Sequence, residues 1–424
     1  MKKIVMSLAL LTISLAVLGA DVDFYGKINL GVWYQKNERF YDDSVMVNDT
    51  TFKLAGDSMP IVISNWLPHG TFGVRYKAGR FGGCIEMGTH YSVFDSKFYG
   101  SATNARIIRK VGDFITMKKW FAEWYINDYF TFLFGKEYVP TNFFPSNQMF
   151  FGGQYRFNNV GCLSTGAYPM FQLKVKSSNG NLEGKVAVIK PDTTVIHIRK
   201  DISIVDHQVS AKLPKFEGGF RYFFTKDIFS TYGNFAGGYQ VYEVVQFEKD
   251  PNLAKDSLYL NVPSFVLGAD LGVKIGPVSL AADVFYGQNI GVYGVFVGDR
   301  YKWWRLTEYM KYYYPEHGSE IIDSTTGDLE WKLYNSTALG AAFILRINAT
   351  DFLAFEGGLG MIFGTHELEE YDERFHNTLA WYFQTELKIL EMLKVMPEVG
   401  QYDYGPLSGF GRYLYWGLNT GIEF

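Results

Sequence analysis

Apolar and polar residues alternate with a period of two along several stretches of this chain. In 264–275, 351–363 and 377–389, mostly apolar residues occupy the odd positions, and mostly small, polar or charged residues occupy the even positions. A strand sends successive side chains to opposite faces, so each stretch predicts a strand with one apolar face. The strands run about eleven to thirteen residues, close to the ~9–11 that cross a bilayer at a tilt. Globular strands are usually shorter, at about 5–6 residues, so the pattern argues against a soluble β-sandwich.

The end of the chain shows the same alternation. In 410–424, one register holds Leu414, Trp416, Leu418, Ile422 and Phe424, and the other holds small or polar residues. The segment 24–34 alternates in the same way and could pair with this last strand. Such pairing would close the sheet, which is obligatory in lipid because a hydrocarbon layer cannot satisfy an open strand edge. We therefore predict a closed, antiparallel, up-and-down barrel.

Short and long connections alternate along the chain. Short turns at one rim and long loops at the other are typical of bacterial outer-membrane barrels. About sixteen strands result, although fourteen or eighteen also fit, because Pro214 blurs 206–247 and the strand at 397–404 is short. The predicted strands start near residues 24, 68, 81, 114, 130, 157, 182, 206, 230, 262, 278, 332, 351, 377, 397 and 410.

Residues 1–20 have the pattern of a secretory signal peptide. Lys2 and Lys3 precede an apolar run that extends to Leu18, and Gly19-Ala20 offers a small-residue cleavage site. The run is short for a membrane anchor. The domain prediction is therefore a signal peptide at 1–20 and one transmembrane β-barrel at 21–424.

Composition supports an exported barrel and excludes other classes. Aromatic residues make up 18% of the chain, 44 residues are glycine, and no apolar run after residue 20 approaches the ~20 residues of a spanning helix. We find no fixed-period repeat, which a β-solenoid would show. Without Lys2 and Lys3, the 40 basic residues become 38 against 44 acidic residues, so the mature charge is −6. This excludes a nucleic-acid partner, which would favour a basic excess.

Four stretches resemble the general bacterial porins, which are sixteen-stranded and usually trimeric outer-membrane barrels. Residues 23–32 (DFYGKINLGV) are similar to the porin first strand, and 132–140 (FLFGKEYVP) to the run that leads into the third loop. Residues 158–160 and Tyr168-Pro169 resemble the strand after that loop, and Phe424 matches the terminal residue.

The resemblance implies an inward-folded third loop at about 140–155, with basic wall residues such as Lys136 and Arg75 facing it. It also implies a homotrimer, and it marks Phe424 as an assembly signal for the barrel-assembly machinery. One difference bears on charge. The third loop of the family usually carries acidic residues, whereas 140–155 has no Asp or Glu. Its charge separation across the channel is therefore in question.

The lumen register contains both signs of charge in near balance, which predicts a wet lumen rather than a strongly charged filter. The acid-free loop and the basic residues Arg106, Arg109 and Lys110 favour a weak preference for anions. Many wall charges would pair across strands and serve only to keep the wall polar. The candidate pore-lining and constriction residues are Lys27, Arg75, Lys77, Glu86, Lys119, Glu123, Lys136, Asn142, Asn147 and Gln148.

These features predict an outer-membrane porin for passive diffusion of small hydrophilic solutes and ions. The alternatives are a channel specific for sugars or phosphate, and a barrel with a structural or adhesive role. No nucleophile–base pattern and no metal-binding His spacing stands out, so we expect no enzyme activity, no cofactor and no metal. The expected partners are outer-membrane lipid and the permeating solutes.

Two features leave alternatives open. Cys84 and Cys162 could form a disulfide or be two separate small wall residues. The loop 289–331, which is rich in aromatic residues, could fold over the mouth, contact a neighbouring molecule or lie at the rim.

Overall fold

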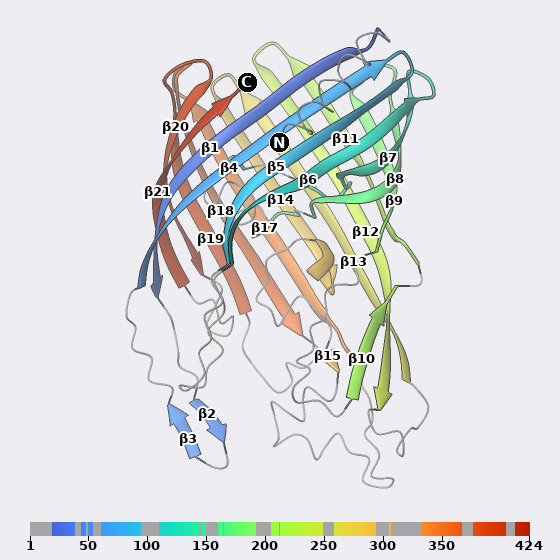
Figure 1. The fold of residues 1–424 in the computed structure, drawn as a ribbon, viewed down its shortest axis with the longest axis vertical. Helices are drawn as coiled ribbons and strands as arrows, with labels where there is room; N and C mark the ends of the chain where they lie inside the picture. The colour runs from blue at the N-terminus through green and yellow to red at the C-terminus, as the bar shows by residue number, and fades with distance from the viewer. Residues whose placement is uncertain are drawn as a thin grey trace.

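The computed structural model describes residues 19–38, 44–47, 50–53, 61–94, 110–143, 146–149, 160–163, 165–191, 205–211, 213–248, 258–293, 305–306, 333–366, 376–403 and 412–424. Residues 1–18 of the predicted signal peptide, Arg106 and Arg109, and most of the loop 289–331 lie outside these ranges. The described strands wrap into a closed barrel, and the chain terminus marked C lies at one end of it (Figure 1).

One antiparallel sheet contains seventeen strands, and two of them, β10 and β11, pair with β12 along its length. They occupy a single position in the wall, so the barrel is sixteen-stranded, as predicted. The wall consists of β1 (Asp21–Glu38), β4 (Ile61–Ala78), β5 (Phe81–Phe94), β6 (Lys110–Tyr125), β7 (Phe130–Tyr138), β8 (Ala167–Lys176), β9 (Leu182–Ile189), β10 (Val205–Ser210), β11 (Lys215–Lys226), β12 (Phe229–Glu248), β13 (Leu258–Ile275), β14 (Val278–Gln288), β17 (Ser336–Asn348), β18 (Leu353–His366), β19 (His376–Lys388), β20 (Leu393–Asp403) and β21 (Arg412–Glu423).

The first and last strands close the ring as predicted. β1 pairs with β21 in an antiparallel register from Lys27↔Glu423 to Glu38↔Arg412. The terminal residue extends this seam, because Gly26 N donates to Phe424 O at 2.8 Å and Phe424 N donates to Gly26 O at 3.0 Å. No edge of the sheet is therefore left open at the seam.

The wall strand is interrupted between β10 and β11, and this interruption explains why the alternation of apolar and polar residues is irregular near Pro214. Proline has no N–H to donate to a sheet and is confined to edges, strand starts and bulges. Here Pro214 directly precedes β11, and the pairing with β12 resumes at Phe216↔Tyr239.

The two registers of the wall differ as the alternation predicted. Large apolar residues of the outward register remain exposed, for example Ile28 at 60% and Val186 at 63%. A soluble protein rarely leaves such a continuous apolar surface in water, whereas an outer-membrane barrel carries an apolar band about 25 Å tall.

The predicted strand start at 157 is wrong. β8 begins at Ala167, and residues 160–163 and 165–166 form no strand. Gly161 and Gly166 have φ angles of 91° and 93°, in a region that interrupts extended backbone. Other predicted starts shift by less. The strand predicted near 68 begins seven residues earlier, at Ile61, and those predicted near 114, 262, 332 and 397 begin four residues away, at Lys110, Leu258, Ser336 and Leu393.

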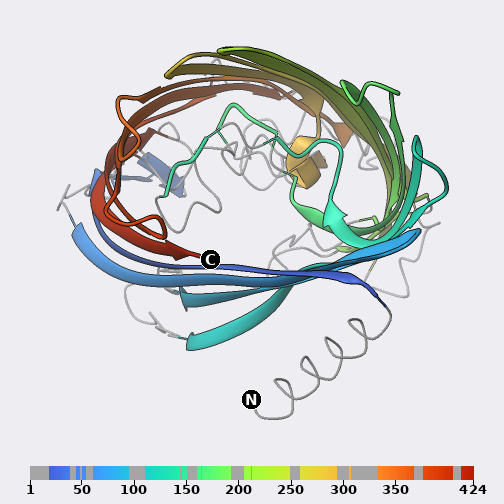
Figure 2. The same cartoon turned by 90° about the horizontal axis from the view of Figure 1, so that it is seen from above.

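Shorter elements lie outside the wall. β2 (Ser44–Val47) pairs with β3 (Thr50–Lys53) in a hairpin beyond the end of the barrel opposite the C-terminus (Figure 1), and β15 (Arg305–Leu306) pairs with β16 (Leu333–Tyr334). The 3-10 helix η3 (Ile290–Tyr293) lies inside the ring when the barrel is seen from above (Figure 2).

The main hydrophobic core lies inside the barrel, on the lumen register of β12 to β21. Small residues such as Ala236, Ala338, Ala342 and Ala380 line this part of the wall and are at most 1% exposed. Phe143, Val160 and Leu163 from the chain between β7 and β8, and Ile290 and Tyr293 from η3, belong to the same cluster. The lumen is therefore partly filled by packed side chains, which the predicted polar register did not indicate.

Candidate functional site: a segment fixed across the lumen

The chain between β7 and β8 enters the barrel. In Figure 2 a teal trace leaves the wall and crosses the inside of the ring. Among its described residues, 139–143 and 160–166 pair with each other, with Phe143 N donating to Leu163 O at 2.7 Å. Gly161 approaches the wall so closely that a Cβ there would lie on the carbonyl oxygen of Ala341. We refer to the described residues 139–143 and 146–149 as the crossing segment.

The base of the crossing segment is held by an ion pair without solvent exposure. The Thr141 N and Oγ1 atoms donate to Glu217 Oε2 at 3.0 and 2.7 Å. The other oxygen of Glu217 lies 2.8 Å from Lys215 Nζ, and both side chains are 0% exposed. The Lys215 ammonium also lies 4.6 Å from the ring centre of Tyr168 and 5.1 Å from that of Tyr293. Charge and two aromatic faces together stabilise this cation away from water.

A hydroxyl pair links the base to η3. Thr141 Oγ1 and Thr165 Oγ1 are 2.8 Å apart, and Thr165 Oγ1 donates to the carbonyl oxygen of Tyr293 at 3.2 Å. The first residues of the loop 289–331 thus fold inward and pack against the crossing segment. We call the group of Thr141, Thr165, Lys215, Glu217 and Tyr293 the base clamp.

The tip of the crossing segment is held by carboxylates of the opposite wall. Asn147 N and Nδ2 donate to the two oxygens of Glu356, each at 2.8 Å. Met149 N donates to Glu398 Oε2 at 2.8 Å. Hydrogen bonds to an ionised acceptor are about twice as strong as neutral ones, so these contacts fix the backbone firmly.

Three buried tyrosines complete the grip on the tip. Gln148 Nε2 donates to the hydroxyls of Tyr402, at 2.9 Å, and Tyr415. The hydroxyls of Ser146 and Tyr382 are 2.7 Å apart. Tyr382 in turn donates to Glu356, and Tyr415 to Glu398, both at 2.7 Å. We call Glu356, Glu398, Tyr382, Tyr402 and Tyr415, which come from β18 to β21, the tip clamp.

Arg346 balances part of this negative charge. Its Nη1 lies 3.2 Å from Glu356 Oε2, and its Nη2 lies 2.7 Å from Glu386 Oε2. The crossing segment has no acidic residue of its own, but acidic side chains are still present at the centre of the barrel. The wall supplies them, and backbone N–H groups of the segment are their partners.

The wall formed by β1 and β4 to β8 carries a second network. Tyr25 donates to Glu86 Oε2 at 2.6 Å, and Lys119 Nζ lies 3.7 Å from Glu86 and 3.8 Å from Glu137. Lys174 Nζ lies 2.7 Å from Glu123 Oε1. The predicted residues Glu86, Lys119 and Glu123 thus lie on the lumen register, where they pair with neighbours.

Arg75 and Lys77 are the more accessible cations of this wall. Arg75 stacks over Tyr25 at 4.8 Å from the ring centre, and Lys77 over Tyr125 at 5.3 Å. Both side chains are exposed, and neither has an ion pair within the described part of the chain. Lys27 faces Glu423 in the β1–β21 register.

Three predicted loop residues lie in the crossing segment. Asn147 and Gln148 bind the tip clamp, as described above. Asn142 has a structural role, because its Oδ1 accepts from Gly166 N at 2.7 Å and so joins the two arms of the segment. Phe424 is 57% exposed on the outward face.

Lys136 does not lie where we expected it. It shares the register of the exposed Phe134 and pairs with Pro169 and Trp120, so it belongs to the outward face rather than the lumen face. Its ammonium donates to Met117 O at 2.8 Å. The reason is the period of two, since residues 132, 134 and 136 must share one face.

Several site residues were not foreseen. Lys215, Tyr382, Glu398, Tyr402 and Tyr415 all lie on the lumen register, and alternation alone places them there. Nothing in the local pattern shows, however, that the last four contact residues 146–149, or that Lys215 pairs with the carboxylate that binds Thr141.

The described part of the chain also contains two cysteines and residues of the types that bind metals. Cys84 and Cys162 are buried, free thiols. Within the ranges given above, no group of three or more His, Cys, Asp or Glu residues could hold a metal ion. No helix in those ranges has the length and apolar character needed to cross a membrane.

No protein-family model matches the chain, and no curated protein matches it. Solved structures do. The outer membrane channel DcaP of Acinetobacter baumannii is 11% identical, with a TM-score of 0.59 over 96% of this chain and 97% of that one.

Two further structures agree. OmpF of Salmonella typhi, in complex with daunomycin, is 11% identical with a TM-score of 0.51 over 96% and 99% of the two chains. OprB of Pseudomonas putida is 10% identical with a TM-score of 0.50 over 95% and 94%. At these identities the likeness concerns the fold. The chain therefore has the closed sixteen-stranded barrel fold of the outer-membrane porins and channels.

Proposed function

We propose that this protein is an outer-membrane porin, which lets small hydrophilic solutes and ions diffuse passively through its lumen. The observation that carries the proposal is the crossing segment, held at its base by Glu217 and at its tip by Glu356 and Glu398. A segment fixed at both ends narrows the lumen, and we propose that the path beside it stays open to solutes.

The proposed channel has a weak preference for anions. Glu217, Glu356 and Glu398 are 2–4% exposed and are engaged by the crossing segment or by cations. Arg75 and Lys77 remain exposed on the other wall. Asp23 and Asp21 of β1 lie opposite Arg75 and Lys77 in the β1–β4 register and are also exposed, so this wall offers both signs of charge. The proposed preference is therefore weak, and it rests on the burial of the carboxylates that bind the crossing segment, because charges accessible in a narrow pore select the opposite sign.

Planar-bilayer recording tests both parts of this proposal. Pure protein should give stepwise, ohmic conductance, and a salt gradient should give a reversal potential with chloride more permeant than potassium. Pure, folded protein that inserts without conductance would contradict the channel. Conductance with potassium more permeant would contradict the anion preference alone.

One observation favours a second candidate, a channel specific for one class of solute such as sugars or phosphate. The core formed by η3, the crossing segment and the alanines of β12 to β19 fills part of the lumen. A narrower path discriminates between solutes more strongly. Liposome-swelling rates would distinguish the two, because a general porin sorts neutral solutes by size, whereas a specific channel saturates with its own solute.

The remaining expectations concern biogenesis and assembly. We propose export through a signal peptide at 1–20, recognition of Phe424 by the barrel-assembly machinery, and a homotrimer in the membrane. The exposed outward face of Phe424 supports its availability to a partner. The mass of the detergent-solubilised protein from light scattering would test the trimer, and a monomeric mass would contradict it.

A further inference from the structure

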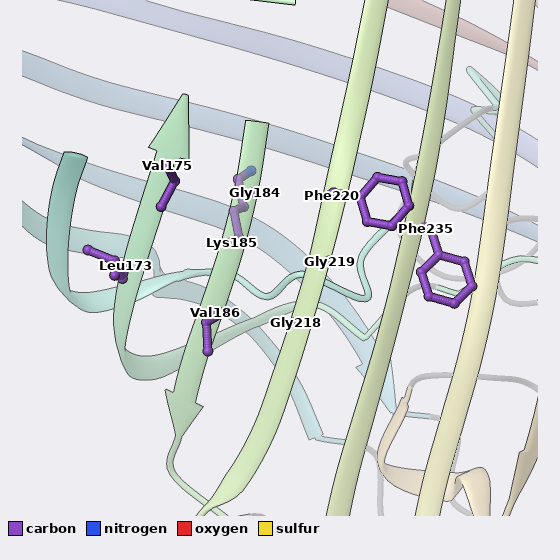
Figure 3. Close-up of a pocket in the computed structure, with 9 residues that line it drawn as sticks. All are labelled: Leu173, Val175, Gly184, Lys185, Val186, Gly218, Gly219, Phe220 and Phe235. Carbon is purple, nitrogen blue, oxygen red and sulfur yellow. The ribbon is translucent and has the colours of Figure 1, made fainter. Parts of the chain in front are cut away.

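A groove runs along the outward face of the barrel between β8 and β12 (Figure 3). It has a volume of about 330 Å³ and is separate from the lumen. Its lining residues are Leu173, Val175, Gly184, Lys185, Val186, Gly218, Gly219, Phe220 and Phe235.

The walls of the groove are apolar and exposed. Val186, Phe220 and Phe235 are 63%, 53% and 43% exposed, and all three lie on the outward register. Lys185 is the one charged residue of the lining, and it belongs to the other register, where its Nζ lies 2.9 Å from Glu183 Oε1. The groove thus offers an occupant dispersion contacts and no hydrogen-bonding side chain.

The floor of the groove is formed by glycines, although neither space nor backbone conformation requires glycine at positions 184 and 218. A Cβ added to Gly184 would meet its nearest atom at 4.0 Å, and one added to Gly218 at 3.5 Å, which are ordinary contacts. Neither residue has a positive φ. Gly219 is different, because a Cβ there would lie 2.7 Å from the Phe235 carbonyl oxygen. Side chains could therefore fill the groove at positions 184 and 218, yet the sequence leaves it open.

We propose that this groove holds one acyl chain of a membrane phospholipid. The inference rests on the proposed function, since it requires the barrel to lie in a bilayer. The groove is continuous with the outward apolar band, whose solvent is then hydrocarbon. Its outward lining is apolar and its single charged residue points to the other register, which suits an acyl chain, and contact with a second copy is an outcome of the test.

Photolabelling in vesicles tests the proposal. Purified protein is reconstituted in phosphatidylcholine that contains a phospholipid with a diazirine near the end of one acyl chain. After irradiation, adducts are mapped by mass spectrometry. Labelling per outward residue in 171–175, 182–188 and 216–220 should exceed that in 339–347 by about threefold, because an enclosed chain makes more contacts than one on a flat wall.

Variants separate the groove from the surrounding belt. Gly184→Leu with Gly218→Leu should reduce groove labelling to the level of 339–347. Gly233→Leu is the matched control, since its added Cβ would also be unobstructed, with Leu271 Cδ1 at 4.0 Å, and it lies outside the lining. The control should keep the excess labelling.

Even labelling of the wild-type belt would overturn the proposal, and this readout stands even if the double variant does not fold. Crosslinks between two copies of the chain at these residues would overturn it in favour of a protein interface. Conductance recorded from the same vesicles distinguishes failure of the lipid site, with conductance retained, from failure of the channel itself.

Discussion

The side-chain nitrogen of Gln148 lies 2.9 Å from the Tyr402 hydroxyl, although the two residues are 254 positions apart in the chain. Both side chains are buried, at 5% and 0% exposed, so neither can replace this hydrogen bond with one to water. This contact joins the tip of the crossing segment to the last strands of the barrel. A substitution of either residue therefore tests whether the tip is fixed there.

Gln148→Ala should release the tip. The hydroxyls of Tyr402 and Tyr415 would lose a buried partner, at a cost of about 1–3 kcal/mol in the free energy of unfolding. We expect a larger single-channel conductance with more open-channel noise, measured in planar bilayers. Gln401→Ala, on the outward register, is the control and should leave conductance unchanged. Identical traces for the two variants would argue against a fixed tip.

Lys215→Met should destabilise the base clamp. Removing one partner of a buried ion pair leaves Glu217 uncompensated, which costs about 3–5 kcal/mol. The variant should unfold at lower urea than wild type, measured by the heat-modifiable mobility of folded barrels. Lys215→Met with Glu217→Gln should recover part of the loss, because no charge then remains buried. If the double variant is less stable than Lys215→Met alone, the pair is not coupled as described.

Arg75→Gln with Lys77→Gln should weaken the preference for anions. Both cations are exposed on the lumen register, so their removal lowers the positive potential that an ion meets there. We expect the chloride-to-potassium permeability ratio to fall about twofold, as expected when a few pore charges are lost. Arg80→Gln, in the short turn after β4, is the control. An unchanged ratio would locate the selective charges elsewhere.

Deleting Phe424 should impair assembly more than conductance. Two backbone hydrogen bonds with Gly26 and the ring contact over Gly26 are lost at the seam, but no lumen residue is removed. The amount of folded protein in the outer membrane measures the effect. Phe424→Ala keeps the backbone bonds and so separates the aromatic signal from the seam. Normal membrane levels of the deletion variant would refute the assembly role.

Cys84 and Cys162 should resist modification in the folded protein. They are both about 1% exposed or less, and burial raises the pKa of the Cys162 thiol, so little reactive thiolate forms. A membrane-impermeant maleimide should add no mass to the folded barrel and two labels after denaturation in detergent. A single label or none after denaturation without reductant would indicate oxidation or a disulfide instead.

The alternation of the sequence was sufficient for the barrel wall. The period of two assigns each side chain to one face, and strand length and loop pattern then indicate a closed membrane barrel. The same rule corrects Lys136, which follows Phe132 and Phe134 in the outward register. For Lys136 the family resemblance predicted the lumen face, whereas the period of two predicts the outward face that the structure shows.

The alternation did not predict the contacts inside the barrel. Alternation shows that Ala338, Ala342 and Ala380 face inward, but not that Phe143, Leu163 and Tyr293 pack against them. It likewise shows Glu356 and Glu398 in the lumen register without showing that the backbone of residues 147 and 149 is their partner. Gly161 and Gly166 have positive φ values that interrupt extended backbone, in the stretch where the alternation predicted a strand starting near 157.

The sequence by itself determined which faces of the strands meet lipid and which meet the lumen, because that choice depends on neighbours two residues apart. Only the tertiary structure decided how the lumen is narrowed. Contacts such as Gln148 with Tyr402 join residues more than two hundred positions apart, and closure of the barrel is what brings them within hydrogen-bonding distance.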